Sequence, residues 1–305
     1  NGNGNDIQFT ATGGTVDASN AQVAGADNIT LDGTGVTATS ATLDNYQNGN
    51  GGGSVDVVAG SGTADIGTST TRSLNDINVS GTDVAASGVT LNNFQDGNGN
   101  GRAIRLEANG GDVTATSSST FDTASDLIVS GTNVDVSGST FDNDQNGNGN
   151  GNIDVNAVNV TGGTVDVSSA TINNFQNGNG NGRDIQLDAT SGSLTGTGVG
   201  IDSNAQIELV GDTMDISDAD LNNYQNSNGA GDIRLETRTG DMVVERAILT
   251  TNGNNRAFGV DTSGDDLFVQ DAEFYVNNAN GNNGELINEN AVDVDGTPAR
   301  GGVTT

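Results

Sequence analysis

Carboxylates are the residues of this chain whose type and number could do chemistry. The 305 residues include 40 acidic and 9 basic ones, and the formal net charge is -31. All nine basic residues are arginine, and histidine and cysteine are absent. The commonest general bases and nucleophiles are therefore missing. Paired carboxylates remain, and glycan-cleaving enzymes use such pairs as acid and base.

The rest of the pattern does not favour catalysis. Carbohydrate-cleaving sites usually add aromatic platforms and basic residues in a groove, whereas aromatic residues make up 4% of this chain and recur at regular intervals. An active site also breaks the symmetry of a repeat, and no segment before residue 250 does so. We therefore expect a non-enzymatic protein, with a polysaccharide lyase or hydrolase as the least favoured alternative.

Cation binding is the second chemistry that the carboxylates suggest. GNGNDIQF (2–9) and NGAGDIRL (228–235) resemble the calcium-binding Gly/Asp nonapeptide of RTX proteins. They depart from it because the apolar residue follows the Asp directly and because the repeat is far longer than nine residues. We expect no cofactor and no defined metal site, while diffuse binding of Ca²⁺ or other cations to an acidic surface stays open.

The charge also restricts the partners. A surface this acidic repels nucleic acid and anionic lipid, so neither nucleic acid binding nor membrane insertion is expected. No apolar run reaches the length of a membrane span. The absence of lysine beside abundant aspartate resembles proteins of halophiles, in which salt screens such self-repulsion. The nine arginines include Arg105 and Arg234 at one repeat position and Arg102 and Arg183 at another, and we expect them to compensate charge locally.

Three Asn-x-Ser/Thr sequons are candidate N-glycosylation sites, at Asn28, Asn78 and Asn159. Asn78 and Asn159 each follow an apolar position, so their side chains should face outward. Glycosylation fits a secreted protein. Coincidence explains the sequons equally well in a chain so rich in Asn, Ser and Thr.

An eleven-residue phrase, LDNYQNGNGGG at 43–53, is written five times. The other copies are at 91–101, 141–151, 172–182 and 221–231. Its aromatic position could be a corner residue that packs the base of a loop, or one ring in an edge for assembly or for carbohydrate binding. The residues of this candidate assembly edge are Tyr46, Phe94, Phe175 and Tyr224, and Asp144 replaces the ring in the third copy.

The segments between the phrases show apolar residues at every second place, which is typical of strands with one buried face. Two kinds of segment alternate, and the copies of each align in columns. One column of the first kind is Ile7, Val55, Ile104, Ile185 and Ile233. One column of the second kind is Leu31, Val79, Val129, Val160 and Leu209.

The spacing of the phrases predicts the architecture. The third and fourth copies lie about 18 residues closer together than the others, and the pattern keeps its phase afterwards. A lost unit of this size fits one coil of a solenoid, in which stacked strands bury narrow apolar ladders. The sequence therefore predicts an all-β fold, a single right-handed parallel β-helix (β-solenoid) of roughly a dozen coils with Asn/Gly-rich corner loops.

The repeats are regular over 1–254, whereas 255–305 reads as degenerate terminal coils with a C-terminal tail. Residues 1–5 repeat the end of the phrase, so we expect that residues before them were removed by processing or lie outside this sequence.

Short Val/Ile/Leu strands separated by Gly, Asn, Ser and Thr, over about 6–250, resemble the repeat regions of filamentous-haemagglutinin-like adhesins and related surface β-helices. The resemblance implies surface display and a non-enzymatic role. We expect an extracellular structural protein at the cell surface whose partners are other copies of itself, stacked end to end into a filament or fibre. The alternative is an adhesin stalk or passenger that binds glycans or cell-surface components.

Overall fold

The chain is an all-β protein. The computed structural model describes residues 6–25, 27–45, 53–93, 103–123, 125–143, 153–157, 163–174, 184–189, 191–203, 205–224, 232–252, 257–262, 266–277 and 285–288. Within these ranges the chain forms 34 strands and no helix. Every pair of neighbouring strands in the described residues is parallel, as the alternating apolar pattern and the repeat predicted.

The strands form three parallel sheets. Sheet A contains twelve of the described strands, and sheets B and C contain eleven each. The strands of sheet A are β1 (Ile7–Thr10), β4 (Ile29–Gly33), β7 (Val55–Ala59), β10 (Ile77–Gly81), β13 (Ile104–Ala108), β16 (Leu127–Gly131), β19 (Ile153–Ala157), β22 (Ile185–Ala189), β25 (Ile207–Gly211), β28 (Ile233–Thr237), β31 (Ala257–Thr262) and β34 (Glu285–Asn288).

Sheets B and C consist mostly of shorter strands. Those of sheet B are β2 (Thr15–Asp17), β5 (Gly35–Thr37), β8 (Thr63–Asp65), β11 (Asp83–Ala85), β14 (Val113–Thr114), β17 (Val134–Asp135), β20 (Val165–Asp166), β23 (Ser193–Thr195), β26 (Thr213–Asp215), β29 (Met242–Glu245) and β32 (Leu267–Gln270). Those of sheet C are β3 (Gln22–Ala24), β6 (Thr42–Asp44), β9 (Thr70–Arg72), β12 (Thr90–Asn92), β15 (Thr120–Asp122), β18 (Thr140–Asp142), β21 (Thr171–Asn174), β24 (Gly200–Ser203), β27 (Asp220–Tyr224), β30 (Ile248–Asn252) and β33 (Glu273–Asn277).

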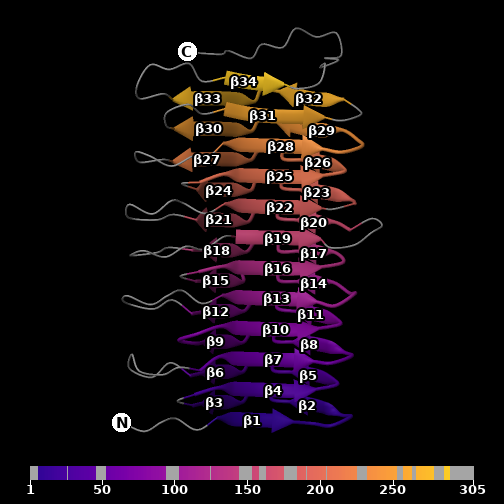
Figure 1. Cartoon of the computed structure of the whole chain (residues 1–305), viewed down its shortest axis with the longest axis vertical. Coiled ribbons are helices and arrows are strands. Elements are labelled where there is room, and N and C mark those ends of the chain that lie inside the picture. Colours follow the sequence, from indigo (N-terminus) through magenta and orange to yellow (C-terminus); the bar gives the residue numbers. More distant parts are fainter. Residues whose placement is uncertain are drawn as a thin grey trace.

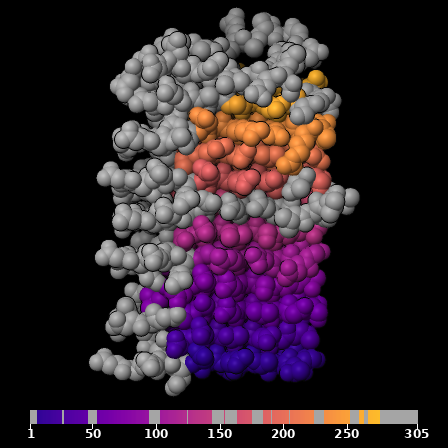
Figure 2. Space-filling model, viewed as in Figure 1, coloured from indigo at the N-terminus to yellow at the C-terminus, as the bar shows by residue number. Residues whose placement is uncertain are grey.

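Each strand pairs with the strands three places before and after it in the chain. Three consecutive strands, one from each sheet, therefore form a unit that we call a coil. The coils stack on one another along the long axis of the molecule, from β1 at one end to β34 at the other (Figure 1). In a space-filling view they appear as rows across the face of the rod (Figure 2).

Ladders of apolar side chains run through the inside of the stack. A coil alone cannot bury its apolar residues, but a coil between two others can, and each fully buried Val, Leu or Ile side chain contributes about 1.5–3 kcal/mol. The clearest ladder lies in sheet A, where register aligns Ile7, Ile29, Val55, Ile77, Ile104, Leu127, Ile153, Ile185, Ile207 and Ile233.

The two kinds of sequence segment share the same ladders. Phe9 pairs with Leu31, and Val57 pairs with Leu31 and Val79, although the sequence placed these residues in separate columns. One column is wrong in detail. Val155, not Val160, stands between Val129 and Leu187 in the register of sheet A, and Val160 itself lies outside the described residues.

The closely spaced third and fourth phrases enclose a single coil, β19, β20 and β21, whereas the first and second enclose two. The lost unit is therefore one coil, as the spacing predicted.

Beyond residue 254, β31 and β34 continue sheet A in unbroken order, with β32 and β33 continuing sheets B and C.

The corner between sheets B and C is turned in each described coil by a residue with positive φ, and between β14 and β15 by two such residues. Most of these residues are not glycine, so their backbones are strained, because the Cβ atom of an L residue crowds the carbonyl oxygen in the left-handed region. In several of these corners a carboxylate three residues before the positive-φ residue accepts a backbone N–H of the turn, as where Asp17 Oδ1 accepts the Ser19 N–H at 2.9 Å. The positive-φ residues at this corner are Asn20, Ser40, Thr68, Gly88, Ser117, Ser118, Gly138, Ser169, Gly198, Asp218, Arg246 and Asp271.

Candidate functional site

The candidate assembly edge falls almost entirely outside the described residues. Tyr46, Phe94 and Phe175 are not among them. Tyr224 ends β27, and its backbone pairs with Asn252 of β30. The proposed row of rings therefore stays a prediction.

A buried asparagine beside that ring position organises the corner between sheets C and A. Asn45 is 1% exposed. Its Nδ2 donates to the carbonyls of Gly53 at 2.6 Å and Asp27 at 3.3 Å, and its Oδ1 accepts the Leu74 N–H at 3.3 Å. One amide thus connects Asp27 at the start of its own coil, Gly53 at the start of the next coil and Leu74 at the end of that next coil.

The same asparagine recurs in all five phrases, and it is buried each time. The other four are Asn93, Asn143, Asn174 and Asn223. Asn223 Nδ2 donates to the Ala205 carbonyl at 2.6 Å. The sequence prediction names only the neighbouring ring, although the asparagine is the more constant residue. Its invariance across the five copies was the signal that could have found it.

Four coils that lack the phrase carry a buried hydroxyl at the same place, whereas the first coil has Gly25 there. Ser73 Oγ lies 3.3 Å from the carbonyls of Gly53 and Asp76, and it accepts the Asn75 N–H at 3.1 Å. A hydroxyl reaches only its near neighbours, which suits a tight corner, whereas the longer amide reaches across the base of a loop. The buried hydroxyl residues are Ser73, Thr123, Ser203 and Thr251.

Many outward carboxylates accept hydrogen bonds from the next coil. At the corner between sheets A and B, Asp83 Oδ1 accepts the Asp112 N–H at 3.0 Å. Asp112 Oδ1 in turn accepts from Asn133 N at 3.2 Å and Nδ2 at 2.8 Å. In the part of the chain that the structure describes, no group of three or more His, Cys, Asp or Glu residues is arranged to hold a metal ion. Diffuse cation binding stays a prediction.

The five described arginines each form an ion pair with a carboxylate of an earlier coil. Arg105 pairs with Asp76 at 3.6 Å and Arg234 with Glu208 at 3.0 Å, which confirms the expected local charge compensation for these two. Arg102 and Arg183 lie outside the described residues. The other pairs are Arg72–Asp44, Arg238–Asp188 and Arg246–Asp218.

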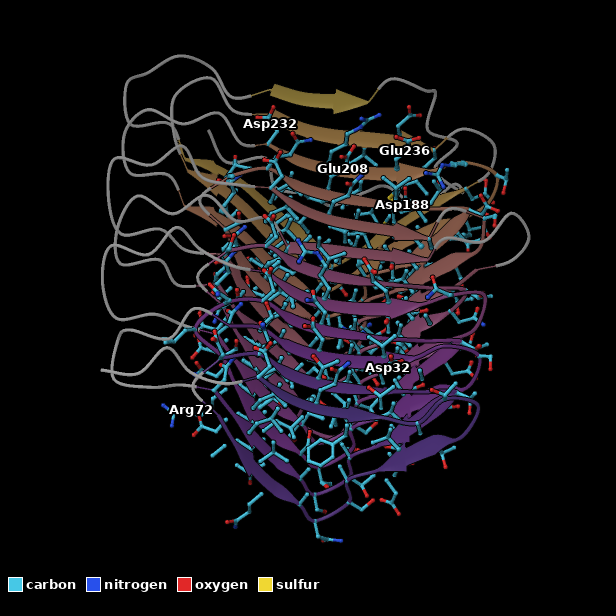
Figure 3. The ribbon with its side chains drawn as sticks, turned by 60° about the horizontal axis from the view of Figure 1, so that its bottom comes forward. Asp32, Arg72, Asp188, Glu208, Asp232 and Glu236 are labelled. Atoms are coloured by element: carbon cyan, nitrogen blue, oxygen red, sulfur yellow. The ribbon has the colours of Figure 1, made fainter. Side chains whose placement is uncertain are left out.

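Arg238 makes the longest connection. Its Nη2 donates to Asp188 Oδ1 at 3.0 Å, two coils away on sheet A. In the register of that sheet Val210 lies between Asp188 and Glu236, two residues before Arg238. Figure 3 labels Asp188, Glu208 and Glu236 on this face. All these pairs are exposed or partly exposed, so solvent screens them and each contributes little to stability.

The shifted carboxyl groups do not form an acid–base pair. Hydrogen bonds from the Ser19 hydroxyl and backbone N–H lower the pKa of Asp17. A hydrogen bond from Arg246 lowers the pKa of Asp218. A glycan-cleaving acid needs the opposite shift, a raised pKa.

The sequon side chains are hydrogen-bonded where the structure describes them. Asn78 Nδ2 donates to Asp56 Oδ1 at 2.7 Å on the outer face of sheet A. Asn28 Nδ2 donates to Asp6 Oδ1 at 3.0 Å, and Asn28 Oδ1 accepts the Ser54 N–H at 3.0 Å. Asn159 lies outside the described residues. Glycosylation stays a prediction, and a glycan on Asn78 would replace one of the two hydrogens of the amide that now donates to Asp56.

Comparisons with known proteins give no relative for this arrangement: no family model, no curated protein and no solved structure matches the chain. In the described residues no helix is long and apolar enough to cross a membrane.

Proposed function

We propose that the chain is a structural, non-enzymatic protein of the cell exterior, the subunit of a self-assembling surface filament or fibre. The proposal includes its winding as a single right-handed parallel β-helix of roughly a dozen coils, because about 98% of crossovers between parallel strands of one sheet are right-handed. The unbroken order of every third strand supports the proposal.

The ends of the described stack carry the argument. Phe9 of β1 is 46% exposed, whereas Leu31, its partner in the same ladder, is fully buried. At the other end Val269 of β32 is 40% exposed, and its partner Val244 is 1% exposed. The same inward positions are thus covered inside the stack and bare at its ends. Among the described strands β1 pairs only with β4, so within the described stack its other edge has no partner strand.

Another parallel coil fits such an end, because it would pair the free edge and cover the bare ladder residues. A second copy of the chain can supply that coil, and so can further coils of a longer chain. Net charge opposes the approach of two copies, so assembly should strengthen when salt shortens the range of the repulsion.

Electron microscopy of the purified protein at high concentration tests the proposal, at low and at high salt. We expect filaments whose width is that of one rod and whose length increases with salt. Phe9→Glu should shorten them, whereas Gln8→Glu, which adds the same charge to an outward position of β1, should not. Monomeric rods at high salt would contradict the proposal.

The glycan-binding alternative has its own readout. A glycan array probed with the unassembled protein should show no selective binding if the chain is a filament subunit. Selective binding without filaments would favour an adhesin stalk, and release of reducing ends from an acidic polysaccharide would favour an enzyme.

A further inference from the structure

Sheet C carries an unusually regular outer face. The first outward position of its strands is threonine in six consecutive coils, and the register aligns all six side by side. They are Thr42, Thr70, Thr90, Thr120, Thr140 and Thr171. We call this column the threonine ladder. Each member precedes a residue that is buried in the core, so the threonines themselves point outward.

Strand propensity alone does not explain the ladder. Threonine suits exposed strand positions, but this preference acts on all three sheets alike. On sheet A the aligned outward residues include Asp56, Asn78 and Arg105. On sheet B they include Ala85, Thr114 and Asp135. Only on sheet C does one residue type persist, and it persists across both kinds of sequence segment and across the shortened repeat.

A second column accompanies the ladder two residues further along each strand. In four consecutive coils it is Asn92, Asp122, Asp142 and Asn173. Asn92 Nδ2 donates to Asp122 Oδ2 at 2.8 Å, which fixes these side chains relative to each other. Together with the four threonines beside them, these residues make a two-column array of hydroxyl, amide and carboxylate oxygens.

The core beneath the array holds it rigid. Leu91, Phe121, Phe141 and Ile172 form the inward column between the two outward ones, and all are fully buried. The rings of Phe121 and Phe141 stack with centroids 4.9 Å apart and planes 13° apart. Stacked ladders of this kind suppress the twist that sheets otherwise have. Successive strands accordingly keep almost the same direction, across the long axis of the rod (Figure 1).

The array therefore has two fixed repeats. Neighbouring coils are about 4.8 Å apart, and outward residues on one strand are about 6.7 Å apart. Both lie close to repeats between oxygen atoms on the faces of hexagonal ice. The threonine hydroxyl can take a lattice hydrogen bond, and its methyl group can sit in the open cage of the lattice. The threonine column is itself uncharged in a chain of net charge -31, whereas the column beside it includes the carboxylates of Asp122 and Asp142.

We propose that the outer face of sheet C binds ice. The binding array consists of Thr90, Thr120, Thr140 and Thr171 together with the second column, Asn92, Asp122, Asp142 and Asn173. The match in spacing would let many weak contacts form at once without ordering any further part of the protein. This activity is separate from filament assembly, because it uses a side face of the rod and not its ends.

Freezing-point measurements on the whole chain test the proposal. We expect thermal hysteresis, a freezing point held below the melting point, together with slower recrystallisation of ice, at concentrations where an equally acidic control protein shows neither. A fluorescently labelled sample should coat an ice hemisphere on selected planes. Absence of all three effects in the unaltered protein would overturn the proposal.

Paired variants separate the face from the rest of the surface. Thr90→Lys with Thr140→Lys places two long charged chains in the ladder and should reduce the hysteresis to the level of buffer. Thr114→Lys with Thr195→Lys makes the same change on sheet B and should leave it unaltered. Equal loss in both variants would count against the proposal. If the first pair fails to fold by circular dichroism, Thr120→Ser, which removes one methyl group, should still lower the hysteresis severalfold.

Discussion

Asp218 and Arg246 stand at the same corner of neighbouring coils, each with positive φ, and they join through two hydrogen bonds. Arg246 Nε and Nη2 donate to the two carboxylate oxygens of Asp218, both at 2.7 Å. Glu245 adds a third contact to the guanidinium at 3.2 Å. A strained corner position thus serves a second purpose, since it holds two coils together by charge.

This pair makes stability depend on pH in acid. The hydrogen bond from Arg246 lowers the pKa of Asp218 below its ordinary value of 3.8, and it raises the pKa of Arg246. A lowered folded-state pKa stabilises the fold above the unfolded-state pKa, and this contribution is lost as pH falls through the folded-state pKa. Asp218→Asn should therefore lower the denaturation midpoint at neutral pH and make no difference in strong acid. A difference that persists in strong acid would mean that the pair is not the cause.

The positive-φ corners offer stabilising substitutions. Ser169 has φ 55° and is exposed, so Ser169→Gly should stabilise the protein by about 0.5–1 kcal/mol once the greater entropy of the unfolded glycine is counted. Ser168→Gly, one residue earlier and without positive φ, is the control and should destabilise. Gly138→Ala should cost about 1 kcal/mol, because alanine must then enter the left-handed region at φ 66°. Urea denaturation measures all three.

The buried asparagines should matter more than their exposed neighbours. Asn45→Ala removes three hydrogen bonds, among them the one that the buried Leu74 N–H donates, so we expect a loss of about 2–3 kcal/mol. Asn222→Ala, in the outward position before another buried asparagine, loses only a half-exposed bond to Asp202 and should cost well under 1 kcal/mol. Equal losses in thermal or urea denaturation would show that Asn45 does not clamp its loop.

The stacked rings of Phe121 and Phe141 should resist truncation. Both are fully buried and in contact, so Phe141→Ala should cost about 3–5 kcal/mol through lost burial and the cavity that remains. Phe141→Leu keeps most of the volume and should cost less than about 1.5 kcal/mol. The double variant with Phe121→Leu should cost less than the sum of the two single changes, because the ring contact is lost only once. Strict additivity would show that stacking contributes nothing beyond burial.

The sequence by itself determined the strands, their inward residues and the stacking of coils. Period-two alternation leaves only one face for the core, and a repeat of fixed length leaves only stacking to bury it, so Ile7, Val55 and Ile104 could be placed in a ladder without coordinates. The shortened interval identified the coil as the unit for the same reason.

The tertiary structure alone decided how the coils align. Alternation says which residues face inward but not which residue of one coil lies beside which of the next, because a shift of two keeps the same face. Register therefore had to show that Leu31 follows Phe9, that Val155 takes the place given to Val160, and that six threonines meet on one face. The buried role of Asn45 was hidden for a related reason: a polar residue is satisfied by backbone groups of other coils, and only the folded chain brings these within reach.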